Sequence, residues 1–89
     1  MEIETVYYYH PNEYFLIDIR ILDMPEVQTS YTIRGEDVEK FMDALKKEYQ
    51  GTLEQMCEQA FGYKINSHLF DAFCKQHAVQ YKFDCDIVV

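Results

Sequence analysis

Three cysteines and one histidine are the residues of this sequence best suited to hold a metal ion. They are Cys57, Cys74, His77 and Cys85, with two residues separating Cys74 from His77. Structural zinc sites usually show two close pairs of ligands, whereas here Cys57 stands alone and Cys85 falls at an expected core position of a strand. We therefore expect three buried thiols, a surface histidine and no metal, and a Cys/His zinc-binding domain remains an alternative.

The histidines and glycines are not arranged as in a known catalytic or nucleotide-binding motif. His10, His68 and His77 belong to different expected elements, and no glycine-flanked nucleophile turn accompanies any of them. The glycines stand singly where helices are expected to begin or end, so no phosphate-cradling loop is present: Gly35, Gly51 and Gly62. The sequence therefore predicts a protein that is not an enzyme and carries no cofactor.

Two carboxylates near the end of the chain have the right spacing for a hard cation. Asp84 and Asp86 project to the same side of an expected strand and could hold Mg²⁺ together with water. A third oxygen ligand cannot be assigned, so a solvated acidic surface is the expected structure.

The charge balance restricts the class of partner. Sixteen acidic residues oppose eight basic ones, which leaves a net charge of −8. This charge repels nucleic acid and anionic membranes and attracts basic surfaces. We therefore expect a protein partner with a basic surface, no direct nucleic-acid binding and no membrane binding.

Length and composition predict one packed unit. A chain of 89 residues with 48% hydrophobic residues can form a single core, so residues 1–89 are expected to be one compact domain. The first residues lack a basic and apolar leader, and no apolar run reaches the roughly 18 residues of a membrane span. Together with the odd number of cysteines, this predicts a cytoplasmic location in the host cell.

The clearest structural pattern is the alternation of residues 14–22, which predicts the central strand of a sheet. Its apolar residues recur at every second position: Phe15, Ile17, Ile19 and Ile21. Residues 2–10 are rich in β-formers and are joined to this strand by Pro11-Asn12-Glu13, which is typical hairpin chemistry.

A three-residue loop would pair His10 with Tyr14, and therefore Glu4 with Arg20. Such loops favour a left-handed residue at the last position, where Glu13 is a poor candidate. A loop of two or four residues would shift the register by one and bury Glu2 and Glu4 beside isoleucines, at a cost of several kcal/mol. We therefore favour the three-residue loop.

The remaining elements complete an α+β order. A strand is expected at residues 28–34, and helices are expected to start near Gly35, at Thr52 with a Thr-x-x-Gln capping box, and at Asn66 or Ser67. The third helix should bury Leu69, Phe70, Phe73 and Cys74. Residues 79–89 alternate again and predict a last strand. This βββαααβ order predicts a four-stranded antiparallel sheet with three helices packed on one face.

The other face of the sheet is the expected binding surface. It should expose apolar and aromatic side chains near the hairpin loop and charged ones elsewhere, a mixture typical of protein-recognition patches. The candidate partner-binding residues are Glu2, Glu4, Tyr8, Tyr14, Leu16, Asp18, Asp84 and Asp86, with Val6 and Arg20 beside them.

These features predict a non-enzymatic, acidic protein-binding module, in the extreme case one that imitates the phosphate spacing of nucleic acid. Small, acidic, tyrosine-rich domains without motifs are common among inhibitors encoded by phages and mobile elements, such as anti-restriction and anti-CRISPR proteins. The likeness is one of size and composition. The alternative is a structural or assembly protein that forms a homodimer through its sheet, either by its edges or through Tyr8, Tyr14 and Leu16.

Overall fold

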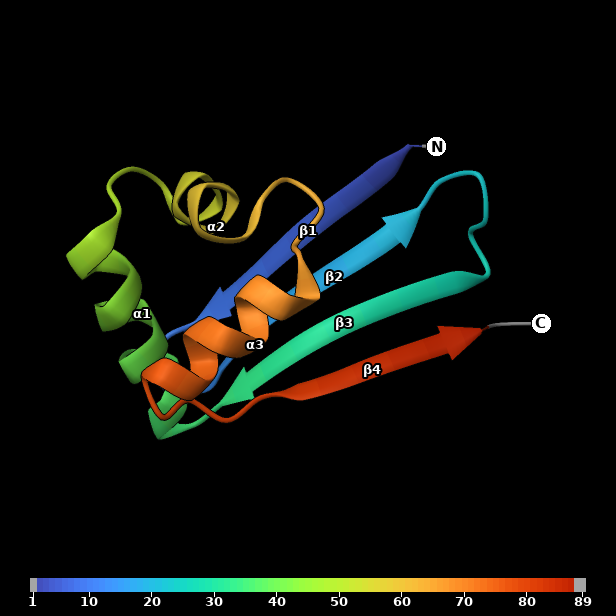
Figure 1. The fold of residues 1–89 in the computed structure, drawn as a ribbon. Helices are drawn as coiled ribbons and strands as arrows, with labels where there is room; N and C mark the ends of the chain where they lie inside the picture. The colour runs from blue at the N-terminus through green and yellow to red at the C-terminus, as the bar shows by residue number, and fades with distance from the viewer. Residues whose placement is uncertain (1, 88–89) are drawn as a thin grey trace.

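The computed structural model describes residues 2–87, except for the side chain of Ile87. The chain forms four strands: β1 (Ile3–His10), β2 (Tyr14–Ile21), β3 (Val27–Arg34) and β4 (Lys82–Ile87). Three helices separate β3 from β4 in the chain: α1 (Glu36–Glu48), α2 (Leu53–Phe61) and α3 (Ser67–Gln76). The strands form one antiparallel sheet in the order β1-β2-β3-β4, and the helices lie on one of its faces (Figure 1). The predicted α+β architecture is confirmed.

The first hairpin has the predicted register. His10 pairs with Tyr14, Tyr8 with Leu16 and Glu4 with Arg20. The loop is closed by the amide of Glu13, which donates to the carbonyl of His10 at 3.0 Å. Asn12 takes the left-handed conformation, with φ of 65°, and asparagine accepts this conformation more readily than most residues do. The left-handed residue of this loop is therefore Asn12 and not Glu13, the position such loops usually favour, because the turn begins at His10.

Side chains define the starts of the second and third helices. The Thr52 hydroxyl accepts from the Gln55 amide at 3.2 Å, and the Gln55 side-chain oxygen accepts from the Thr52 amide at 2.9 Å. This reciprocal pair is the predicted capping box. At α3, Oδ1 of Asn66 accepts from the amides of His68 and Leu69, so Asn66 rather than Ser67 is the cap.

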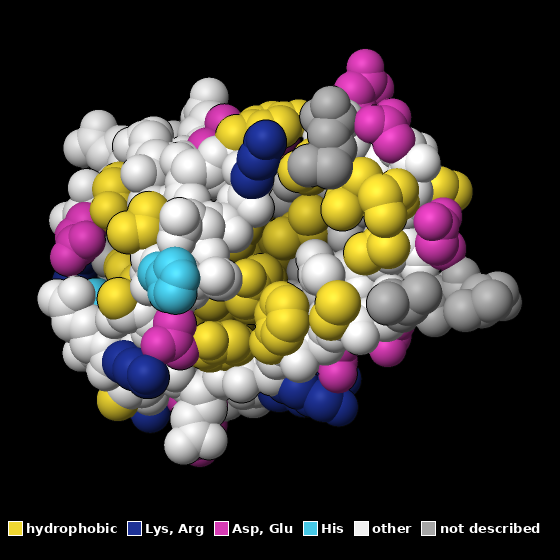
Figure 2. Space-filling view, turned by 45° about the vertical axis from the view of Figure 1, so that its right-hand side comes forward, with side chains coloured by type: hydrophobic (Ala, Val, Ile, Leu, Met, Phe, Trp, Pro, Cys, Tyr) yellow, Lys and Arg dark blue, Asp and Glu magenta, His cyan; other side chains and the backbone are white. Residues whose placement is uncertain are grey.

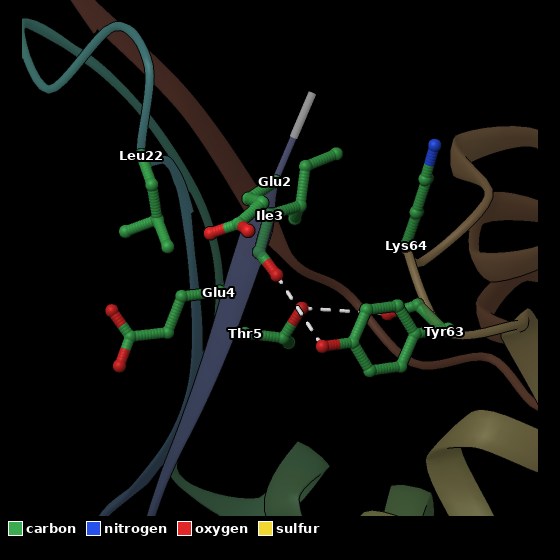
Figure 3. Close-up of a pocket in the computed structure, with 7 residues that line it drawn as sticks. All are labelled: Glu2, Ile3, Glu4, Thr5, Leu22, Tyr63 and Lys64. Atoms are coloured by element: carbon green, nitrogen blue, oxygen red, sulfur yellow. Dashed lines mark hydrogen bonds between the residues drawn. The ribbon is translucent and has the colours of Figure 1, made fainter.

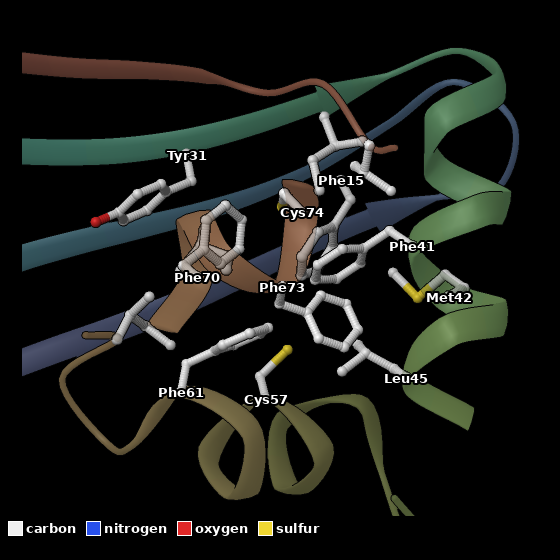
Figure 4. Packing of buried hydrophobic residues seen from close by; sticks show 14 of the residues in the cluster. Phe15, Tyr31, Phe41, Met42, Leu45, Cys57, Phe61, Phe70, Phe73 and Cys74 are labelled. Carbon is white, nitrogen blue, oxygen red and sulfur yellow. The ribbon is translucent and has the colours of Figure 1, made fainter. Parts of the chain in front are cut away.

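The core lies between the helices and the covered end of the sheet and is dominated by phenylalanines (Figure 4). Phe41 of α1 is fully buried, and its ring lies 5.2 to 6.1 Å from four other phenylalanine rings. These neighbours come from the sheet and the other two helices: Phe15, Phe61, Phe70 and Phe73. Phe41 therefore joins all the layers of the fold.

Two predictions about burial and strand length were wrong. Leu69 is 51% exposed, because the buried stripe of α3 consists of Phe70, Phe73 and Cys74, and Leu69 lies on its flank. The last strand starts at Lys82 rather than at residue 79. The predicted strand positions Val88 and Val89 lie outside the described residues.

Candidate functional site

The face of the sheet that points away from the helices is open, as predicted. Neighbouring strands bring its side chains into rows that cross the sheet. One row contains Tyr8, Leu16, Thr32 and Lys82. The next two contain Val6, Asp18, Ser30 and Asp84, and then Glu4, Arg20, Gln28 and Asp86. The predicted binding residues on the strands therefore share one continuous surface. Glu2, which is exposed, lies directly before the first residue of β1.

The hairpin end of this open face is aromatic and apolar. Tyr8 is 39% exposed and lies opposite Leu16, which is half-buried. The His10 and Tyr14 rings lie 4.6 Å apart. Tyrosine and a neighbouring aliphatic side chain supply rigid contact area at protein interfaces, so this end can anchor a partner.

The rest of the open face is charged but partly neutralised. The Arg20 guanidinium donates to the Asp18 carboxylate at 3.1 and 3.2 Å, and this hydrogen bond raises the pKa of Arg20. Lys82 lies 3.8 Å from Asp84. In the described part of the chain Glu4 and Asp86 have no ion-pair partner. They stand at the two ends of the row that contains Arg20 and Gln28, so the acidic character is concentrated toward the end of the sheet far from the hairpin loop.

The opposite face of the sheet contains a second candidate surface, which the sequence analysis missed. The helices cover the end near the hairpin loop, where Phe15 and Ile33 are fully buried. Toward the other end the cover stops, and Phe83 is 49% exposed. We call this region the uncovered strip. Its side chains are half-buried or exposed: Ile3, Ile21, Val27, Thr29, Phe83 and Cys85.

Figure 2 shows this region as hydrophobic side chains that continue from a hollow beside the helices toward the far end of the sheet. The alternation of residues 79–89 had indicated one inward face but not how far the helices reach along it. No signal in the sequence fixes that limit, since it depends on where the helices pack.

Tyr63, in the turn between α2 and α3, fastens the helical layer to β1 at one side of the strip (Figure 3). Its hydroxyl donates to the Ile3 carbonyl at 3.3 Å, and its own carbonyl accepts from the Thr5 hydroxyl at 3.4 Å. A hollow of about 510 Å³ opens here, lined also by Leu22 and Lys64. The hollow is shallow and its lining is mixed, so it extends the strip at the β1 edge.

The cysteines do not form the metal site that was considered. Cys57 and Cys74 are fully buried, and burial is the main cause that raises the pKa of each thiol to about 12. Cys85 is exposed, so its predicted burial was wrong; it belongs to the uncovered strip. Within residues 2–87 no group of three or more histidine, cysteine or acidic side chains is placed to hold a metal ion.

Two buried polar atoms lack a hydrogen-bond partner among the described residues: the hydroxyl of Tyr7 and Nε2 of His77. Burial raises the pKa of Tyr7 strongly. His77 packs on the Phe73 ring at 4.6 Å and is half-buried, so it is not the surface residue expected. After burial, the nearby Cys57 and Glu58 contribute most to the raised pKa of Tyr7.

Comparisons with known proteins returned no match to a protein-family model, to a curated protein or to a solved structure. No helix within residues 2–87 is long and apolar enough to cross a membrane. The function is therefore argued from the two faces of the sheet.

Proposed function

We propose that this protein is a non-enzymatic, acidic binding module whose open sheet face docks a basic surface of a partner protein. The observation that carries the proposal is the composition of one exposed plane, which has the aromatic end around Tyr8 on one side and, two rows further along the strands, the carboxylates of Glu4 and Asp86. Exposed tyrosine supplies contact area, and unpaired carboxylates orient a cationic partner and accelerate its approach.

The charge of the whole chain acts in the same direction. A net charge of −8 on 89 residues attracts basic proteins and repels phosphate backbones. A partner that itself handles nucleic acid has the required basic surface. The specific form of the proposal is therefore an inhibitor of the phage or mobile-element type, for example anti-CRISPR-like, acting in the cytoplasm of the host cell.

Imitation of phosphate spacing is not needed for this function. Asp18 is held by Arg20, and Lys82 lies beside Asp84, so these two carboxylates are partly neutralised before a partner arrives. We propose instead that Tyr8 and Leu16 supply most of the affinity for the partner, and that the unpaired carboxylates at the far end orient the partner as it binds.

Affinity capture from host lysate, followed by binding of the purified partner, tests this function. We expect a nucleic-acid-handling protein whose binding to its nucleic acid is inhibited by the wild-type chain. Tyr8→Ser should weaken the complex about tenfold or more, because it removes an aromatic anchor. Glu4→Gln combined with Asp86→Asn should slow association at low salt and change dissociation little.

Tyr9→Ser is the matched control, since Tyr9 is exposed to a similar extent, 42% against 39%, but projects to the opposite face. It should bind as the wild type does. Complexes that form equally well at ionic strengths of about 0.05 M and 0.3 M would contradict an electrostatic contribution. Full retention by Tyr8→Ser would remove the open face from the proposal.

A homodimer joined through sheet edges is a second candidate, favoured by β4. This strand is an edge of the sheet, and none of the described residues pairs with its outer side. An antiparallel pair of β4 strands centred on Phe83 would place Lys82 of each copy opposite Asp84 of the other. Exposed edges are templates for such pairing, and opposite charges across strands support it.

Sedimentation equilibrium at high micromolar concentration tests the dimer. If β4 pairs with itself, the wild type should have twice the monomer mass, and Asp84→Lys should dissociate it because lysines then face each other across the interface. Glu13→Lys, which makes the same charge change in the hairpin loop, should leave the mass unchanged. A wild type that remains monomeric would eliminate this candidate.

A further inference from the structure

The uncovered strip is about as broad as a helix on its β4 side. On β4 it begins at Phe83, and the strand continues four residues further to Ile87, roughly 13 Å at the rise of a strand. It narrows toward β2, where Ile19 is buried and Ile21 is the residue that belongs to it. An α-helix with its side chains is about 10–12 Å across. Across four strands the sheet is roughly 15–20 Å wide, the length of three to four helical turns.

The existing helical layer shows how such a helix would pack. Phe70 of α3 lies 4.5 Å from the Tyr31 ring of β3, measured between ring centroids, and 5.0 Å from Tyr81. Tyr31 also lies 5.0 Å from Phe83, which is half exposed. A chain of aromatic contacts therefore runs from the core to the strip and ends at a ring with one side uncovered.

The charges at the far end of the strip are of one sign. Asp23 and Glu26 are exposed in the turn between β2 and β3, and the Leu22 amide, which donates to the Glu2 carbonyl, keeps this turn beside the start of β1. Acidic side chains gather at this end in Figure 2. They make no ion pair with any of the described residues. Lys64 lines the hollow at the β1 side of the strip, on the turn between α2 and α3.

A second copy of the chain fits this surface poorly. A twofold interface brings the same patch of each copy together, and two copies that each carry a net charge of −8 repel one another. A cationic partner is attracted to the acidic end, whereas a second copy is repelled. The apolar side chains of the strip would pack against an apolar stripe of the partner, and the acidic end would pair with lysine or arginine beside that stripe.

We propose that the uncovered strip is a docking site for an amphipathic helix of a partner protein, with an apolar stripe over Ile21, Phe83 and Cys85 and basic residues facing Asp23 and Glu26. The bound helix extends the helical layer along the sheet. This site lies on the face opposite Tyr8 and Leu16, so it does not depend on the function proposed for the open face.

The test uses the complete chain and synthetic peptides of about 14 residues, or four helical turns. The probe carries leucines at i, i+3, i+4 and i+7 with lysines along one flank, and a fluorescent label reports binding by anisotropy. We expect saturable binding with a dissociation constant below about 1 mM. A scrambled peptide of the same composition and a peptide with glutamate in place of lysine should each bind about tenfold more weakly.

Phe83→Gln should weaken the lysine peptide about tenfold, since it removes the exposed ring of the strip. Asp23→Lys combined with Glu26→Lys should reverse the preference between the lysine and glutamate peptides. Tyr9→Gln, on the same face at the opposite end of β1, and Tyr8→Gln, on the open face, should both bind as the wild type does. Circular dichroism melts verify that each variant is folded.

Three results would overturn the proposal: no saturable binding, equal binding by folded Phe83→Gln, or equal binding of the lysine and scrambled peptides. A wild type whose strip is protected in a self-dimer, detected by mass together with loss of Cys85 labelling, would also overturn it. Loss of binding in Tyr8→Gln alone would assign the peptide to the open face instead. Because Tyr8 and Phe83 lie on opposite faces, failure of one proposal leaves the other intact.

Discussion

Replacing Phe41 with alanine is expected to lower the free energy of unfolding by about 3–5 kcal/mol. The side chain is fully buried and its ring contacts phenylalanines from the sheet, α2 and α3. Its loss removes apolar burial and leaves a cavity where all the layers meet. Because small domains are stable by about 5–15 kcal/mol, the variant should lie close to the unfolding threshold. Urea unfolding followed by circular dichroism measures the change in midpoint at constant slope.

Leu69→Ala is the matched control, since it also truncates a large apolar side chain on a helix of the same layer. Leu69 is 51% exposed, so the change should be within about 1 kcal/mol. A larger loss would mean that Leu69 is buried in solution, as its sequence pattern had suggested. A loss below about 1 kcal/mol for Phe41→Ala would contradict the packing around that ring.

One of the three cysteine thiols should react fast with a thiol reagent, and the other two should react slowly. The pKa values of Cys57 and Cys74 are raised from 9.0 to about 12, which lowers their thiolate fraction near neutral pH by about three orders of magnitude. Cys85 is exposed on the uncovered strip. Titration with a chromogenic disulfide reagent should therefore give one rapid equivalent and two that react about a hundredfold more slowly or slower still.

Cys85→Ser should eliminate the rapid phase, and all cysteines of the denatured chain should react at similar rates. Rapid reaction of two or three thiols in the native protein would show that α2 and α3 do not seal the core.

The same pKa values predict a pH effect on stability. The folded protein keeps these thiols protonated to a higher pH than the unfolded chain does. Their contribution to the free energy of unfolding is therefore complete below about pH 9 and is lost as the pH rises toward 12.

Tyr81 should add to this alkaline loss. Its hydroxyl donates to Oδ1 of Asp71 at 2.7 Å, and this hydrogen bond, followed by burial, raises its pKa to about 12. Deprotonation breaks the hydrogen bond and places two negative charges side by side. The hydrogen bonds from Lys75 and Tyr81 lower the pKa of Asp71, so the same contact also weakens in acid.

Local sequence determined most of the elements of this fold. Pro11 and Asn12 define the turn of the first hairpin, and with it the register that places Phe15 and Ile17 in the core. Thr52 with Gln55, and Asn66, define the starts of two helices. These features were predictable because each depends on residues within a few positions of one another. The open face followed from the same register, since strand side chains alternate between the two faces.

The uncovered strip was decided only by tertiary packing. Alternation assigns Phe83 and Cys85 to the helix-facing side, but burial requires a helix above them. Phe70 of α3 packs on Tyr31, the β3 partner of Phe83, and leaves Phe83 and Cys85 exposed on β4. Strands of eight residues extend roughly 26 Å, farther than this helical layer reaches. The sequence therefore determined which side chains share a face, and the tertiary structure decided which of them remain available to a partner.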